Sequence, residues 1–335
     1  MNKADQETYE FDAIKTALLN NDAPFPPTMV YFFSDIAPKD LQLLSDVWPE
    51  VWIERRRGLL EDMENLAESD TLLYFDLVAI MCLEDDDPVA RATAVRLLWQ
   101  SQKESLVPKL LQLLKEDPEA IVRAAAATAL GKFVYLGELE EISASTYQSV
   151  LESLIKAHLD APDTTVRRRA LESLGYTGRS EVPDFIQRAY DKNDEEWLQS
   201  ALCAMGRSYD RRWVDHVLRM LDHPDSIVRY EAIRAAGELE AKAAREPLFD
   251  LMEEGTDDDD IYYAIVWALS KIGGEGVRSM IENAIAETDD IDEIQFLEEA
   301  LENLDFTEQV TQFDLMAFDE DVLDSWIDED EGSID

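Results

Sequence analysis

Apolar residues recur along this chain with the period of an amphipathic helix, and short polar turns interrupt them at regular intervals. The clearest stretch is residues 117–131, DPEAIVRAAAATALG, in which Val122, Ala126 and Leu130 follow one another at steps of four residues. Because an α-helix turns once every 3.6 residues, such a row forms a single apolar stripe. Versions of this stretch recur along most of the sequence, so the pattern predicts helices separated by short turns.

Seven positions of this pattern align as equivalents, and five of the six gaps between them have nearly the same length. Successive positions are 32, 44, 31, 31, 33 and 32 residues apart. The aligned positions are Arg91, Arg123, Arg167, Leu198, Arg229, Tyr262 and Ile294. A fixed period of this length is the signature of a repeat architecture. The one long gap predicts an inserted loop or short helix around residues 136–147.

An acidic residue stands four places before every aligned position, where a carboxylate can cap the start of a helix. These acids are Asp87, Glu119, Asp163, Asp194, Asp225, Asp258 and Asp290. A glycine follows the stripe in four of the units, at Gly131, Gly175, Gly206 and Gly237. We expect the helix to end or bend at these glycines.

Each unit therefore contains about 32 residues and two antiparallel helices. One such pair cannot bury both of its faces, whereas stacked pairs share a continuous core, so the predicted fold is an all-α solenoid. We expect three regions: residues 1–70 form a helical cap with a degenerate first pair, residues 71–304 form about seven repeats, and residues 305–335 form an acidic tail.

The repeated pattern D-x-x-V-R-x-x-A-x-x-A-L-G resembles the HEAT repeat, in the short type known from phycobilin lyases. It is clearest at residues 119–131, 163–175 and 225–237. The resemblance covers residues 71–304 and implies a right-handed superhelix of antiparallel helix pairs. It also implies that the pattern's arginines, Arg91, Arg123, Arg167 and Arg229, form a structural ladder with acids of the neighbouring unit; ligand binding is the alternative role.

The charge of the chain narrows the classes of partner. Thirty Lys and Arg residues against 74 Asp and Glu give a formal net charge of -44. This charge repels nucleic acids and anionic membranes, so neither is expected as a partner. A partner selected by charge would be basic, although acidity can also serve solubility in a saline cytoplasm. We recognise no signal peptide and no run of 18 apolar residues, which predicts a soluble cytoplasmic protein.

No motif of an enzyme or a cofactor site stands out. Cys82 and Cys203 lie far apart in apolar segments, and the three histidines lack carboxylates at the spacing of metal ligands. The chain also lacks the His-Glu dipeptides that di-iron hydroxylases built from helical repeats use. Neither a phosphate-binding loop nor a nucleophile elbow is present. We therefore expect no enzymatic activity, no metal and no cofactor.

The remaining candidate surface is the concave face of the solenoid. In HEAT-like proteins the second helices usually line it, and positions one and five residues after each aligned position point away from the buried stripe. Instead of acids, several of these positions carry residues that are enriched at binding hot spots. They are Arg96, Arg168, Tyr230, Arg234, Tyr263 and Trp267. These residues predict a site for an acidic and aromatic protein segment; packing of the rings on adjacent helices is the alternative.

The acidic tail carries large apolar residues among its carboxylates, namely Phe318, Leu323, Trp326 and Ile327. Its charge is typical of a solvated disordered segment. Its aromatic residues indicate that part of it docks, either on this protein or on another. Docking in the chain's own groove, where a partner would displace it, is one such hypothesis.

Three functions remain open from the sequence. The first is a non-enzymatic, monomeric scaffold or adaptor that binds another protein on its concave face. The second is an accessory lyase or chaperone-like factor for a tetrapyrrole-bearing protein. The third is an acidic decoy that occupies a basic, nucleic-acid-binding surface.

Overall fold

The computed structural model describes residues 9–255 and 258–309. The described residues form two compact units, which meet in the sequence between Val182 and Pro183. Every regular element within the described residues is helical, which confirms the predicted all-α class and the solenoid of helix pairs.

The first unit begins with the predicted N-terminal helices. Ile14 and Leu18 of the first helix are fully buried, as their spacing predicts. The helices of this unit are α1 (Phe11–Leu19), α2 (Pro27–Val30), α3 (Pro38–Val47), α4 (Ile53–Ser69), α5 (Asp76–Cys82), α6 (Pro88–Leu97), α7 (Val107–Glu116), α8 (Ala120–Glu138), α9 (Ala144–Asp160) and α10 (Thr164–Leu174). Helix α6 packs on α5, α8 on α7, and α10 on α9, while α4, α6, α8 and α10 stack on one another.

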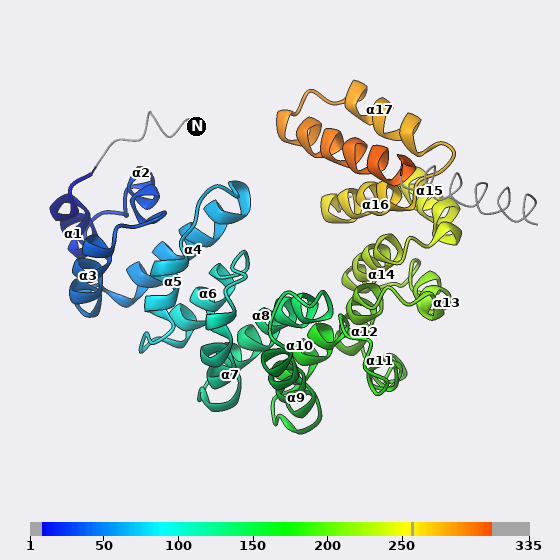
Figure 1. Ribbon diagram of the computed structural model, residues 1–335. Coiled ribbons are helices and arrows are strands. Elements are labelled where there is room, and N and C mark those ends of the chain that lie inside the picture. Colours follow the sequence, from blue (N-terminus) through cyan, green and yellow to red (C-terminus); the bar gives the residue numbers. More distant parts are fainter. Residues whose placement is uncertain (1–8, 256–257, 310–335) are drawn as a thin grey trace, which may run out of the picture. The chain divides into compact units, whose positions relative to one another are not determined.

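The second unit repeats this arrangement. Its helices are α11 (Val182–Tyr190), α12 (Glu195–Arg207), α13 (Val214–Leu218), α14 (Ser226–Glu238), α15 (Arg245–Glu254), α16 (Asp259–Ile272), α17 (Val277–Glu287) and a last helix described over residues 291–309. Figure 1 shows α12, α14 and α16 following one another along this unit, and these helices pack in succession. Each of the seven aligned sequence positions lies in the second helix of a pair.

Six of the seven predicted acids cap their helices. The carboxylate of Asp87 accepts a hydrogen bond from the backbone N–H of Ala90 at 2.9 Å, and that of Asp225 accepts one from Val228 at 2.9 Å. The exception is Glu119, whose side chain caps nothing. The carboxylate of Asp117 instead accepts the backbone N–H of Glu119 at 3.0 Å, so the shorter acid two residues earlier orders that turn.

The extra residues predicted around residues 136–147 as a loop or short helix form neither a long loop nor a separate helix. The extra residues lengthen two helices, because α8 runs on to Glu138 and α9 begins at Ala144. A tight turn joins them, in which Glu140 adopts a positive φ of 59°.

The predicted helix end is confirmed at Gly175, the C-cap of α10, and α12 and α14 end one residue after Gly206 and Gly237. Three of the glycines also have a second role in packing. A Cβ at Gly237 would lie 2.8 Å from the Cα of Ala268, and one at Gly206 would lie 3.0 Å from the Cα of Ala235. A Cβ at Gly131, inside α8, would lie 2.7 Å from the Oγ of Ser173. These glycines therefore let the next helix of the stack approach closely, and α8 alone of the three helices continues for two turns past its glycine.

Arg91 makes the predicted ladder contact with an acid of the neighbouring unit. Its guanidinium binds both oxygens of Asp117, at 2.8 and 2.9 Å. Arg123 and Arg229 instead donate to backbone carbonyls five and six residues before them, in the turn of their own unit. Arg167 likewise donates from Nε to the carbonyl of His158. The shared role is to tie down the turn before the second helix.

Helix α8 is the one helix of the described residues that is long and apolar enough to cross a membrane, judged by length and composition. Arg123 and Lys132 interrupt this helix, so it is not an uninterrupted run of 18 apolar residues. Half of its apolar window is buried within the fold, where α8 packs against α6, α7, α9 and α10. Its apolar character therefore matches its place in the core of the first unit.

Candidate functional site

A groove opens in the second unit between α14, α16 and the helix over residues 291–309. Its volume is about 240 Å³. We call it the aromatic groove; it is lined by Tyr230, Arg234, Gly237, Glu238, Asp260, Tyr263, Ala264, Trp267, Ala268, Lys271 and Phe296. All of these residues belong to one compact unit.

Small residues of α14 and α16 create the groove. Gly237 lets α16 approach α14 closely, and Ala264 and Ala268 are buried at its base. Since these residues have little or no side chain, they do not fill the space between the larger side chains around them. Those larger side chains project from the neighbouring helical turns and form the walls.

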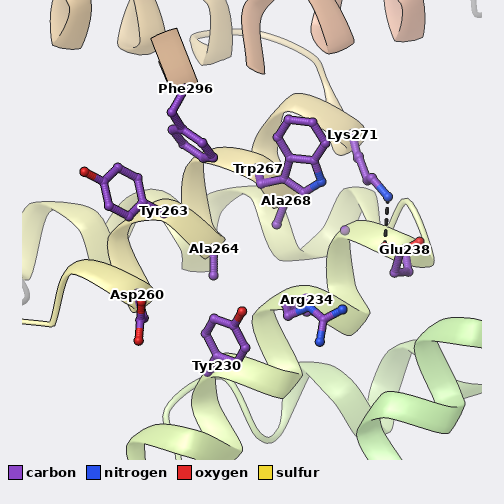
Figure 2. Close-up of a pocket in the computed structure, with 11 residues that line it drawn as sticks. Tyr230, Arg234, Glu238, Asp260, Tyr263, Ala264, Trp267, Ala268, Lys271 and Phe296 are labelled. Carbon is purple, nitrogen blue, oxygen red and sulfur yellow. Dashed lines mark hydrogen bonds and ion pairs between the residues drawn. The ribbon is translucent and has the colours of Figure 1, made fainter. Parts of the chain in front are cut away.

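Aromatic rings form one wall. The ring of Tyr263 meets that of Phe296 edge to face, with centroids 4.8 Å apart, and Trp267 lies 6.2 Å from Phe296. Figure 2 shows Phe296 between Tyr263 and Trp267, with Tyr230 and Arg234 on the α14 side. Edge-to-face pairs at these separations are favourable and hold the rings in place. Trp267 nevertheless remains 36% exposed, so its indole is available to a ligand.

Charged groups of both signs surround the rings. The Nζ of Lys271 donates to the carboxylate of Glu238 at 2.9 Å. The guanidinium of Arg234 lies 5.7 Å above the ring of Tyr230 and makes long contacts to Glu231, at 3.4 and 3.5 Å, through Nη1 alone. Its Nε and Nη2 make no hydrogen bond within the described residues, so these donors are free to meet a ligand.

The surroundings of the groove shift the pKa of two of its residues, Arg234 and Tyr263. Partial burial opposes the charge of Arg234, but Glu231, Cys203 and Tyr230 together outweigh it, so the pKa of Arg234 is raised. The pKa of Tyr263 is raised above its ordinary value by burial first and then by the carboxylates of Glu293 and Asp259. The groove therefore presents a cation and a phenol O–H.

The structure brings four of the six predicted surface residues together in this groove: Tyr230, Arg234, Tyr263 and Trp267. The other two lie elsewhere. Arg96, in α6 of the first unit, binds both oxygens of Glu64 at 2.6 and 2.7 Å. Arg168 is only 6% exposed, so its predicted place on an open face is wrong. A buried guanidinium serves internal packing, because its charge needs partners inside the protein.

Sequence reasoning missed Phe296, Lys271, Glu238 and Asp260. The helical row that begins with Tyr263 and Trp267 continues four residues on to Lys271, and the row of Tyr230 and Arg234 continues to Glu238. Extending each row by one helical turn would have identified Lys271 and Glu238. Phe296 was missed for a different reason, since the expected position in that helix was the neighbouring Gln295, which is exposed.

The three histidines take part in hydrogen bonds or ring packing within the fold. The Nδ1 of His158 lies 3.1 Å from the carbonyl of Arg167, that of His223 accepts the N–H of Asp225, and the His216 ring packs against Tyr190 and Trp213. Over residues 9–255 and 258–309, no group of three His, Cys, Asp or Glu side chains is placed to hold a metal ion. The predicted tail residues Phe318, Leu323, Trp326 and Ile327 lie outside the described residues.

Comparison with known proteins identifies the repeat. A family model described as HEAT repeats matches residues 76–145, 151–229 and 214–302. A comparison with curated proteins finds no significant match.

Several solved structures resemble the chain at low identity. The X-ray structure of Escherichia coli YibA is 18% identical over 84% of this chain and 98% of that one, with a TM-score of 0.42. The complex of CpcE and CpcF of phycocyanin lyase from Nostoc is 19% identical over 68% and 94%, with a TM-score of 0.46. Human deoxyhypusine hydroxylase in complex with glycerol is 17% identical over 78% and 95%, with a TM-score of 0.35.

Proposed function

We propose that this chain, which belongs to the HEAT-repeat family, is a non-enzymatic cytoplasmic adaptor whose aromatic groove binds a segment of another protein. The observation that carries the proposal is the gathering of Tyr230, Arg234, Tyr263 and Trp267 from the stacked helices α14 and α16 around one cavity. Tyr, Trp and Arg are the residues that dominate binding energy at protein interfaces. The adaptor acts as a monomer in this proposal.

The size of the groove favours a protein segment over a small-molecule ligand. Pockets that enclose drug-sized molecules measure roughly 300 to 1,000 Å³. The groove holds about 240 Å³, which suits one large side chain of a segment lying across it. Such a side chain would replace water on the exposed indole of Trp267.

The chemistry of the walls defines the partner segment. An aromatic or large aliphatic side chain fits against Trp267 and Phe296, because their rings offer both edges and faces. A carboxylate fits beside Arg234, because its free Nε and Nη2 form the planar fork that binds carboxylates in bidentate fashion. The proposed ligand therefore has an aromatic residue close to an Asp or Glu.

Substitution of Trp267 tests this function. We expect the variant Trp267→Ala to bind its ligand on the order of 30-fold more weakly, since loss of a hot-spot side chain costs ~2 kcal/mol or more. Random peptides displayed on phage should give, with the wild-type chain, a consensus of an aromatic residue near Asp or Glu. A synthetic peptide of that consensus then provides the affinities.

The matched control is Trp99→Ala, which removes a similarly exposed tryptophan from the first unit. This control should bind the peptide as the wild type does. If Trp267→Ala and Trp99→Ala bind equally well, or if no consensus emerges, the groove is not the binding site. A pigment with visible absorbance that co-purifies equally with both variants would favour the tetrapyrrole-related alternative.

A further inference from the structure

The chain itself contains a segment with the chemistry that the aromatic groove fits. Residues 310–335 hold ten Asp and Glu residues and no Lys or Arg. Large apolar residues lie among these acids, including Phe318, Leu323, Trp326 and Ile327. Phe318 is followed directly by three acids, and Trp326 lies two residues after Asp324. The aromatic residue and nearby carboxylate required of the ligand therefore occur twice within ten residues.

The described chain ends beside the groove. Phe296 forms part of the aromatic wall, and seven residues later the Nδ2 of Asn303 donates to the Oγ of Ser270 at 2.8 Å. A Cβ at Gly273 would lie 3.6 Å from the Cγ2 of Thr307. The helix over residues 291–309 thus runs beside α16 in the same direction and ends near its C-terminal end, as Figure 1 also shows.

This end of α16 carries the cation Lys271, which lines the groove. Lys271 is eight residues from Tyr263, so the two are about 12 Å apart along the helix axis. Phe318 follows residue 309 by nine residues, which can span about 30 Å when extended. The chain beyond residue 309 is therefore long enough to return an aromatic side chain to any part of the groove.

We propose that residues 318–327 dock in the aromatic groove of the same chain and compete there with the partner segment. An aromatic ring of the segment packs on Trp267 and Phe296, and a neighbouring carboxylate binds Arg234. This inference rests on the proposed function, because both occupants use the same rings and the same guanidinium. A tethered segment competes at an effective concentration in the millimolar range, so even a weak contact holds back a partner.

A photo-cross-linker in the full chain tests the docking directly. Trp326 is replaced by p-benzoyl-phenylalanine, the protein is irradiated at low concentration, and the cross-linked peptides are identified by mass spectrometry. We expect cross-links within one chain to peptides that contain Tyr230 to Arg234 or Tyr263 to Trp267. The matched control carries the same probe at Ile334, outside the docking segment 318–327. It should give at least fivefold fewer cross-links to these peptides.

Mixing chains labelled with ¹⁴N and ¹⁵N separates contacts within one chain from contacts between two. Cross-links that join the two isotopes, or equal yields from positions 326 and 334, overturn the proposal. A loss of the groove cross-links in the Trp267→Ala chain supports it.

Competition provides a second readout. The full-length variant in which Phe318, Leu323, Trp326 and Ile327 are all replaced by Ser should bind the consensus peptide about tenfold more tightly. Unchanged affinity contradicts the competition. If the peptide depends on Trp267 but the cross-links fall elsewhere, the docking fails and the proposed function stands. If the cross-links reach the groove but no peptide depends on Trp267, the proposed function fails alone.

Discussion

At the scale of single residues, the acids of the repeat do more than begin helices. The carboxylate of Asp87 accepts the N–H of Ala90 and also binds the Nε and Nη2 of Arg57, at 2.9 and 2.6 Å. The Asp87 side chain is almost fully buried. One residue therefore caps α6 and connects it to α4. Asp163 caps α10 in the same way, through the N–H of Val166.

We expect Asp87→Ala to lower the free energy of unfolding by about 2 to 3 kcal/mol, because it removes a helix cap and leaves a guanidinium without its buried partner. Asp163→Ala, the matched control at a less buried cap, should lose about 1 kcal/mol. Urea denaturation of both variants measures the difference. Equal losses would mean that the contact between Asp87 and Arg57 contributes nothing to stability.

The same residue predicts a dependence on pH. The hydrogen bond from Arg57 holds the pKa of Asp87 below its ordinary value. The folded chain thus binds this proton more weakly than the unfolded chain, so the stabilisation is complete above the unfolded pKa of about 3.9. It is lost as the pH falls through the lower folded value. Asp87→Asn, which keeps a capping oxygen, should lose less stability than the wild type between pH 5 and pH 2.

At the scale of helices, close approach depends on residues without a side chain. Gly237 of α14 faces Ala268 of α16, and a Cβ would lie 2.8 Å from a backbone atom. Gly58 of α4 has nothing within 4 Å of its Cβ position. These two helical glycines therefore separate the effect of packing from the effect of helix propensity.

We expect Gly237→Ala to destabilise the chain by about 1 to 3 kcal/mol, because overpacking pushes α16 away from α14. It should also weaken peptide binding, since the aromatic groove lies between these helices. Gly58→Ala should stabilise the chain by about 0.5 to 1 kcal/mol, because alanine favours the helix. Thermal unfolding and peptide titration measure both effects; a neutral Gly237→Ala variant would contradict the close packing.

The helices and their order were predictable from the sequence because the determinants are local. Caps such as Asp225 and apolar rows such as Val122, Ala126 and Leu130 act within one or two turns of their own helix. The face that holds Tyr230 and Trp267 was predictable for the same reason.

The errors concern contacts between helices, which local patterns do not contain. Gly131 reads as a helix end in the sequence, yet its neighbour Ser173 lies 42 residues away and makes it a packing site. Phe296 lines the groove in place of its neighbour Gln295, which the repeat pattern predicts. Which of the two residues faces α16 depends on how the two helices pack, and the repeat pattern does not contain that information. Arg168 had the helical position of a surface residue but is buried.

At the scale of the whole molecule, the net charge of -44 acts on every partner at long range. It attracts a basic partner and repels an acidic segment until salt screens it, over a distance of about 10 Å at 0.1 M and 3 Å at 1 M. The dependence of binding on salt therefore distinguishes the adaptor function from the acidic-decoy alternative.

For the consensus peptide, we expect an affinity that stays within about threefold, or increases, between 0.05 and 0.5 M NaCl. Apolar contacts with Trp267 and Phe296 supply most of its binding, and salt relieves the repulsion between the acidic peptide and the acidic chain. A basic partner held only by charge should lose at least tenfold in affinity over the same range. Titrations of wild type and Trp267→Ala at each salt concentration decide between them. A steep loss with salt, shared by both chains, would show that charge alone recruits the partner and that the groove contributes nothing.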